Sequence, residues 1–123
     1  MSRLVVLVFL AVAAVGPAGE SAPTENSRIE YLLTVIASLP DAQFIRNGKA
    51  YDGKAAADHM RTKLRFAGPR VRTAEDFIRY CASQSSLSGQ PYEIRFADGR
   101  AVRSADFLRQ KLVEFDERSR RPD

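Results

Sequence analysis

The sequence predicts an α+β fold in which four helices lie on one face of a small antiparallel sheet made of two short β-hairpins. Apolar residues recur at helical spacing in four separate segments. Between the first and second segments, and between the third and fourth, short runs flank Asn-Gly or Asp-Gly, dipeptides typical of hairpin turns. Because a lone hairpin is only marginally stable in water, we expect the two to pair into one sheet.

The first helix is expected to begin at Ser27, because Ser27 and Glu30 form a capping-box pattern. Its apolar face carries Ile29, Leu32, Leu33 and Ile36. Leu39-Pro40-Asp41 predicts the end of this helix, since a residue before proline disfavours helical geometry. The first hairpin follows at residues 44–51, with Asn47-Gly48 as its turn.

The second helix is expected from about Gly53 to the stop at Gly68-Pro69. Thr73 and Asp76 form a further capping pattern, which predicts the start of the third helix. Residues 83–91, rich in serine and glycine, predict a loop.

The second hairpin begins with a strand at residues 92–96, where apolar and polar side chains alternate. Asp98-Gly99 provides the turn, and the return strand covers residues 100–103. Ser104 is expected to cap the fourth helix.

The two halves of the chain resemble each other in sequence. Residues 57–64 (ADHMRTKL) and 105–112 (ADFLRQKL) are identical at five of eight positions, and residues 47–51 (NGKAY) resemble 98–102 (DGRAV). We interpret this as an internal duplication of an αββα unit. His59 then aligns with Phe107, which predicts a packed or half-buried histidine.

Residues 1–18 predict a secretory signal peptide that is cleaved after Ala18. A single cation, Arg3, precedes twelve apolar residues, too few for a membrane-spanning helix of about 20, so we expect no transmembrane anchor after cleavage. The mature chain is expected to comprise a flexible leader (19–26), one α+β domain (27–117) and a basic disordered tail (118–123). This places the protein in the periplasm or outside the cell.

The charge and the cysteine content of the chain also limit its possible partners and cross-links. The 19 Lys and Arg residues face 15 Asp and Glu, and loss of Arg3 with the signal peptide lowers the net charge from +4 to +3. The cations are scattered among acids, which is typical of a solvated surface, and export argues against a nucleic-acid partner. Cys81 is the single cysteine, so no intramolecular disulfide forms, and its helical position predicts a buried thiol.

Four segments resemble the YfeK-like family of bacterial secreted proteins of unknown function. They are residues 44–48 (FIRNG), 59–64 (HMRTKL), 73–78 (TAEDFI) and 82–92 (ASQSSLSGQPY). The resemblance covers residues 27 to 96, and it implies a periplasmic setting in Gram-negative bacteria but no activity. In that family an acid usually stands where this chain has Ala55, which weakens any mechanism that needs a carboxylate beside His59.

Specific recognition is expected where polar and aromatic side chains gather between the helices. The candidate ligand-binding residues are Arg46, Asn47, Tyr51, His59, Ser85, Ser86, Ser88 and Tyr92. The serines have two interpretations: they satisfy the backbone of the turn and the end of the third helix, or they form a polar platform. Arg46 likewise either clamps a carboxylate or sulfate, or pairs with Glu75 or Asp76.

Catalytic and metal signatures are weak. The Gly-x-Ser-x-Gly elbow is missing, and no serine is followed three residues later by lysine. One histidine and one cysteine, on separate helices, do not make a zinc site. We therefore assign no catalytic residue, metal or cofactor.

The sequence predicts a non-catalytic binding or accessory protein of the cell envelope, whose partner is an envelope protein, a peptide or a glycan. Two alternatives remain open. One is a small periplasmic hydrolase that uses His59 with a serine of the 83–90 loop, and the other is a secreted enzyme inhibitor that inserts a hairpin or loop.

Overall fold

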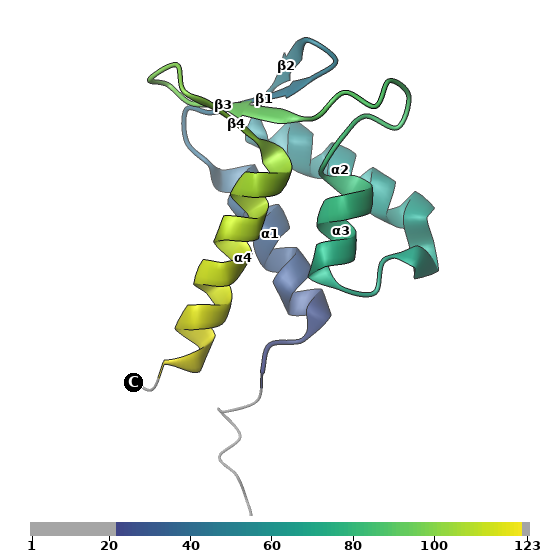
Figure 1. The fold of residues 1–123 in the computed structure, drawn as a ribbon, viewed down its shortest axis with the longest axis vertical. Coiled ribbons are helices and arrows are strands. Elements are labelled where there is room, and N and C mark those ends of the chain that lie inside the picture. Colours follow the sequence, from purple (N-terminus) through teal and green to yellow (C-terminus); the bar gives the residue numbers. More distant parts are fainter. Residues whose placement is uncertain (1–21, 122–123) are drawn as a thin grey trace, which may run out of the picture.

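The computed structural model describes residues 22–121, so the predicted signal peptide and the start of the leader lie outside the described residues. The elements in chain order are α1 (Glu25–Ser38), β1 (Gln43–Arg46), β2 (Lys49–Tyr51), α2 (Gly53–Ala67), a 3₁₀ turn η3 (Gly68–Arg70), α3 (Ala74–Cys81), β3 (Glu93–Arg95), β4 (Ala101–Arg103) and α4 (Ser104–Arg120). The order helix, hairpin, helix therefore occurs twice (Figure 1).

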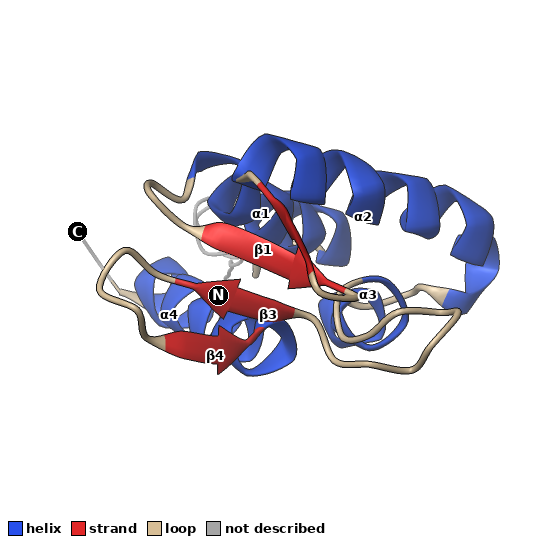
Figure 2. Cartoon of the chain, turned by 90° about the horizontal axis from the view of Figure 1, so that it is seen from above, coloured by secondary structure: helices blue, strands red, loops and turns tan. Residues whose placement is uncertain are grey.

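The four strands form one antiparallel sheet in the order β2-β1-β3-β4. Strands β1 and β3 pair at the centre, with Phe44 opposite Ile94, and thereby join the two hairpins. The helices lie on one side of the sheet (Figures 1 and 2). Phe44 and Ile94 are buried on that side, whereas their neighbours on the other side are exposed or half-buried. The predicted α+β class, with four helices and a sheet of two hairpins, is confirmed.

The turn of the second hairpin is one residue longer than the turn of the first. Asn47 (φ 52°) and Gly48 (φ 78°) both adopt the left-handed conformation that a two-residue turn requires. In the second hairpin Gly99 alone is left-handed (φ 89°), and its N–H donates to the carbonyl of Phe96 at 2.9 Å. This longer loop, with glycine at its last position, is the other common way to close a hairpin.

The first helix begins earlier than the capping pattern at Ser27 predicted. Its N-cap is Thr24, whose Oγ1 accepts a hydrogen bond from the N–H of Ser27 at 3.0 Å. The expected leader is therefore helical from Glu25 onwards. Thr24 and Ser27 both carry a hydroxyl that could cap the helix. The helix already includes Glu25, whose carboxylate accepts a hydrogen bond from the N–H of Ala74 on α3 at 2.8 Å. The cap is therefore Thr24, because a cap is the residue that precedes the first helical residue.

The predicted cap at Ser104 is wrong. The N-cap of α4 is Arg103, which provides no side-chain hydrogen bond, and Ser104 is the first helical residue. Its side chain is fully buried, and its Oγ has no hydrogen-bond partner among residues 22–121. Packing against the sheet thus decided the orientation of this hydroxyl.

The expected disordered tail at 118–123 is also partly wrong. Helix α4 continues to Arg120, and the guanidinium of Arg118 donates to the hydroxyl of Tyr31 on α1 at 3.0 Å. Stacking of Tyr31 on Phe115, with ring centroids 4.4 Å apart, supports the same contact. Residues 122–123 lie outside the described part of the chain.

Helix α1 lies at the centre of the domain and contacts the other three helices. Its fully buried residues Leu32, Leu33 and Ile36 pack with Phe77 and Ile78 of α3. Cys81 belongs to the same core and is inaccessible, as predicted, and burial raises the pKa of its thiol.

Gly53 sets the distance between α1 and α2. A Cβ atom at this position would overlap the carbonyl oxygen of Ile36 and lie 3.2 Å from that of Ala37. Because both neighbours are backbone atoms, they cannot yield without moving α1.

Replacement of Gly53 by alanine is therefore expected to lower the free energy of unfolding by about 2–3 kcal/mol, the upper part of the range for an overpacked core, because the clash is with backbone atoms. Urea titration followed by circular dichroism measures this loss. Gly48→Ala is the control, since Gly48 has a left-handed φ of 78° but no atom near the added methyl group, and it should cost only about 1 kcal/mol. A Gly53→Ala variant as stable as the wild type would contradict the close helix contact.

Candidate functional site

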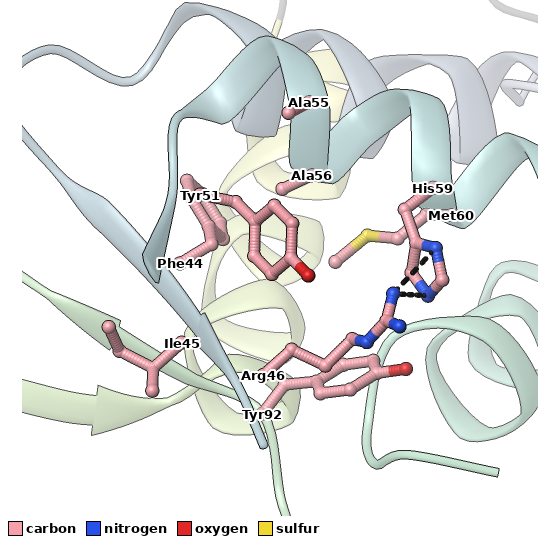
Figure 3. Close-up of a pocket in the computed structure, with 9 residues that line it drawn as sticks. All are labelled: Phe44, Ile45, Arg46, Tyr51, Ala55, Ala56, His59, Met60 and Tyr92. Atoms are coloured by element: carbon pink, nitrogen blue, oxygen red, sulfur yellow. Dashed lines mark hydrogen bonds between the residues drawn. The ribbon is translucent and has the colours of Figure 1, made fainter. Parts of the chain in front are cut away.

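A pocket of about 260 Å³ lies between the first hairpin and α2 (Figure 3). Its floor is apolar and includes Phe44, Ala56 and Met60. Its polar and aromatic lining consists of Arg46, Tyr51, His59 and Tyr92. Four of the eight predicted site residues therefore share one cavity.

Local periodicity explains how these side chains meet. Along β1, Phe44 and Arg46 are two residues apart and so face the same side of the sheet, whereas Ile45 points away (Figure 3). On α2, His59 follows Ala56 by three residues, which puts both on one helical face. Tyr92 comes from the other half of the chain and is buried beside β1, because β3 pairs with β1.

The central contact of the pocket joins Arg46 and His59. The Nη1 atom of Arg46 lies 2.9 Å from Nδ1 and 2.7 Å from Nε2 of the imidazole. A guanidinium only donates hydrogen bonds, so the imidazole must accept and is therefore neutral in this arrangement. The Arg46 guanidinium carbon also lies 5.6 Å from the ring centroid of Tyr51, which is within the range of a cation–π contact.

The surroundings of His59 keep it neutral. Burial lowers the pKa of His59 most, and the positive charges of Arg46 and Lys63 lower it further. Lys63 is held in place because its Nζ donates to the hydroxyl of Tyr92 at 3.1 Å and to the carbonyl of Gln84 at 2.9 Å. The pocket thus contains the cation of Arg46 beside a neutral imidazole, and Lys63, which lines a neighbouring cavity, adds a second positive charge nearby.

The residues that line the pocket include no carboxylate. The expected alternative, an ion pair of Arg46 with Glu75 or Asp76, is wrong: Glu75 binds Arg109 at 2.6 Å, and Asp76 accepts from the backbone N–H of Arg72 at 3.0 Å. Within residues 22–121, Arg46 makes no ion pair with any acid. Ala55 also lines the pocket.

The serine-rich loop is tied to the tip of the first hairpin. The side-chain amide of Asn47 donates to Oγ of Ser85 at 3.1 Å, and the hydroxyl of Ser88 donates to the amide oxygen of Asn47. Ser85 is buried and also accepts from the N–H groups of Leu87 and Ser88. The hydroxyl of Ser83 donates to the last turn of α3, at the carbonyl of Ile78.

These bonds match the first of the two interpretations of the loop, in which hydroxyls satisfy the backbone. Asn47, Ser85 and Ser88 hold the loop against the hairpin and do not line the pocket. Ser86 lies elsewhere, in a second cavity of about 390 Å³ that is also lined by Phe66 and Tyr80. The loop therefore positions the pocket without contributing a hydroxyl to it.

The arrangement suits binding better than known catalytic chemistry. His59 has a cavity beside it, but no serine lines that cavity, so the pair expected of a Ser-His hydrolase is not assembled there. Among residues 22–121, no group of three or more His, Cys, Asp or Glu side chains is placed to hold a metal ion.

Sequence reasoning missed the floor of the pocket. Phe44 and Met60 carry the same signal as any core residue, an apolar side chain at the expected period. Only the tertiary structure shows that they border a hollow.

The fold and the pocket define a small α+β domain with a basic, apolar-floored cavity. The chain belongs to the family of unknown function DUF5329, whose model matches residues 23–116. Over 68 residues it is 43% identical to the uncharacterised protein YfeK of Salmonella typhimurium strain LT2, a match that covers 55% of this chain and 57% of YfeK. No solved structure matches the chain significantly. The predicted resemblance to YfeK is confirmed, and neither comparison names an activity.

The depressed pKa of His59 predicts how stability depends on pH. The unfolded chain takes up a proton near the ordinary pKa of 6.5, whereas the folded chain does so only at lower pH. The free energy of unfolding should therefore fall as the pH drops from 7.5 through 6.5 towards the pKa of the folded state.

Urea titrations at pH 7.5, 6.5 and 5.5 measure this slope, with His59→Gln as the comparison. Since His59 is the only histidine in the chain, the difference between the two proteins isolates its contribution. Equal pH slopes for the wild type and His59→Gln would contradict the depressed pKa.

Proposed function

We propose that this chain is a non-catalytic binding protein of the bacterial cell envelope, and that its pocket holds an anionic group of a small ligand, a peptide or a glycan. The observation that supports this most directly is the state of Arg46, which is half-buried, makes no ion pair within residues 22–121 and points at a neutral imidazole. A half-buried cation of this kind is stabilised when an anion binds beside it.

The geometry of Arg46 suits a carboxylate or sulfate. A guanidinium has five N–H donors, and the contacts with His59 involve only the Nη1 atom. Nε and Nη2 make no hydrogen bond to any described residue, and these two groups form the fork that binds an oxyanion through two parallel bonds. Lys63 adds a second positive charge one helical turn from His59.

The rest of the lining favours a ligand that is not purely polar. Tyr51 and Tyr92 provide aromatic surface with a hydroxyl at one end, and the floor is formed by Phe44 and Met60. Pockets of this composition, mostly apolar with a few polar groups that fix orientation, are typical of small-ligand sites.

The two alternatives have less support. A hydrolase would need a serine near His59, whereas Ser85 and Ser88 are bonded to Asn47. An inhibitor would present a protruding loop, and the observation that favours it is Leu87, which is 92% exposed in the 83–91 loop. One exposed leucine is ordinary on protein surfaces.

Export is the other half of this proposal, and it rests on the pattern of residues 1–18, which lie outside the described residues. In residues 22–121, none of the helices has the length and apolar character needed to cross a bilayer.

Export is tested by expressing the full chain in a Gram-negative host and measuring its mass in the periplasmic fraction. We expect a protein that begins at Gly19. Val8→Arg is the control, since a charge in the apolar run should block processing and leave the full-length chain in the cell. A wild-type chain that keeps residues 1–18 and stays in the cytosol would overturn the localisation.

Anion binding is tested by NMR with acetate as the probe, at constant ionic strength, following the imidazole signals of His59 in the untagged protein. A bound carboxylate stabilises the imidazolium, so acetate should raise the pKa of His59 in a saturable way. Arg46→Gln should abolish the effect. Arg65→Gln removes the same charge from an exposed residue whose guanidinium donates a hydrogen bond to Thr62, away from the pocket, and it should behave as the wild type.

An equal response in wild type and Arg46→Gln, or a response that never saturates, would count against the pocket as an anion site. It would leave the fold and the helix contacts untouched.

A further inference from the structure

The strand register relates residues of the first half of the domain to residues of the second half. Phe44 pairs with Tyr51 in the first hairpin, and Ile94 pairs with Val102 in the second. Because all four side chains face the helices, Phe44 corresponds to Ile94, and the second turn is one residue longer. Two residues further along the strands, Arg46 corresponds to Phe96.

The helices give the same correspondence. The motif shared by residues 57–64 and 105–112 aligns His59 with Phe107 and buried Met60 with buried Leu108. The Arg46–His59 contact therefore occupies the place that Phe96 and Phe107 occupy in the other half.

In the second half this space is filled by protein. The rings of Phe96 and Phe107 pack against each other, with centroids 5.9 Å apart and planes inclined by 53°, and both contact the core. In the first half the Arg46–His59 pair leaves a pocket of about 260 Å³ beside it. It lies beside Tyr51, Met60 and the small side chains of Ala55 and Ala56 (Figure 3).

The volume is right for one aromatic ring with a short polar extension. An apolar cavity of about 150 Å³ holds benzene, and the larger volume leaves room for a carboxylate next to Arg46. Met60 provides a thioether, a group that packs favourably against aromatic rings, and Tyr51 and Tyr92 provide ring faces.

We infer that the ligand of this pocket is a carboxylate separated from an aromatic ring by one or two carbon atoms. The ring lies in the cavity beside the Arg46–His59 pair, above Phe44 and Met60, and the carboxylate binds the Nε and Nη2 donors of Arg46. This inference rests on the proposed anion site and adds the chemical class of its ligand.

Such a group has two natural sources. One is a free arylalkanoic acid such as phenylacetate, in which one carbon atom separates the carboxylate from the ring. The other is the C-terminal phenylalanine or tyrosine of a peptide, in which two carbon atoms separate them. The shared chemistry is the same, so the experiment contains an arm for each source.

The experiment compares four probes by the same NMR titration: acetate, phenylacetate, 2-phenylethanol and acetyl-Gly-Phe. Burial of one ring is expected to make phenylacetate bind about 10- to 100-fold more tightly than acetate. The neutral alcohol should bind at least tenfold more weakly than phenylacetate. Tighter binding of acetyl-Gly-Phe than of phenylacetate identifies a peptide terminus as the source, and weaker binding identifies the free acid.

A single variant, its control and a double variant test the role of Arg46 and the correspondence between the halves. Arg46→Gln should lose phenylacetate binding, while Arg65→Gln should keep it. The double variant Arg46→Phe with His59→Phe rebuilds the aromatic pair of the second half, so it should fold with undiminished stability and should not bind phenylacetate, which isothermal calorimetry measures without the histidine signal.

The outcomes separate the two levels of the proposal. If acetate binds but phenylacetate binds no more tightly, the aromatic ligand class is overturned and the anion site stands. If neither binds, both are overturned. If 2-phenylethanol binds as tightly as phenylacetate, the proposed role of Arg46 is wrong. If the double variant still binds phenylacetate, the proposed binding site in the pocket is wrong.

Discussion

Pairing of β1 with β3 is the interaction on which the rest of the domain depends. Each hairpin has strands of three or four residues and would be marginal alone, but the Phe44–Ile94 pair at the centre joins them into one sheet with a buried face. That face covers α1, whose apolar side chains fill the centre of the domain. The same pairing brings the two helix-hairpin-helix halves into a symmetric arrangement, which is the topology that a duplicated αββα unit would produce.

The pocket depends on this arrangement because both halves of the chain contribute residues to its lining. Arg46 and His59 come from the first half, while Tyr92 comes from the start of the second hairpin. Because the two halves share one arrangement, contacts that occur in both halves serve the fold. A contact that occurs in one half only needs a separate explanation. An aromatic pair closes one half, and an arginine–histidine pair beside a hollow replaces it in the other.

The distribution of acids explains why the pocket stays positive. Asp116 pairs with Arg28, Glu30 with Arg61 and Glu75 with Arg109, and each pair links two helices. The two exposed pairs, Glu30–Arg61 and Glu75–Arg109, contribute little to stability, up to about 1 kcal/mol each, but the second one binds the carboxylate of Glu75 that the sequence offered to Arg46. Burial and the positive charges of Arg46 and Lys63 lower the pKa of His59 and so favour its neutral form.

The sequence by itself determined the fold class, the four helices and the turn at Asn47-Gly48, because periodicity and the φ preferences of Asn and Gly act within a few residues. It also identified Thr73 as a helix cap and Cys81 as buried. It misplaced the cap at Ser27, where Thr24 offered a second hydroxyl, and the cap at Ser104, which is the buried first residue of α4. The tertiary structure alone decided that four of the eight candidate residues share a cavity and that Asn47, Ser85 and Ser88 bind one another, since strand pairing and side-chain packing over long sequence distances set which polar groups meet.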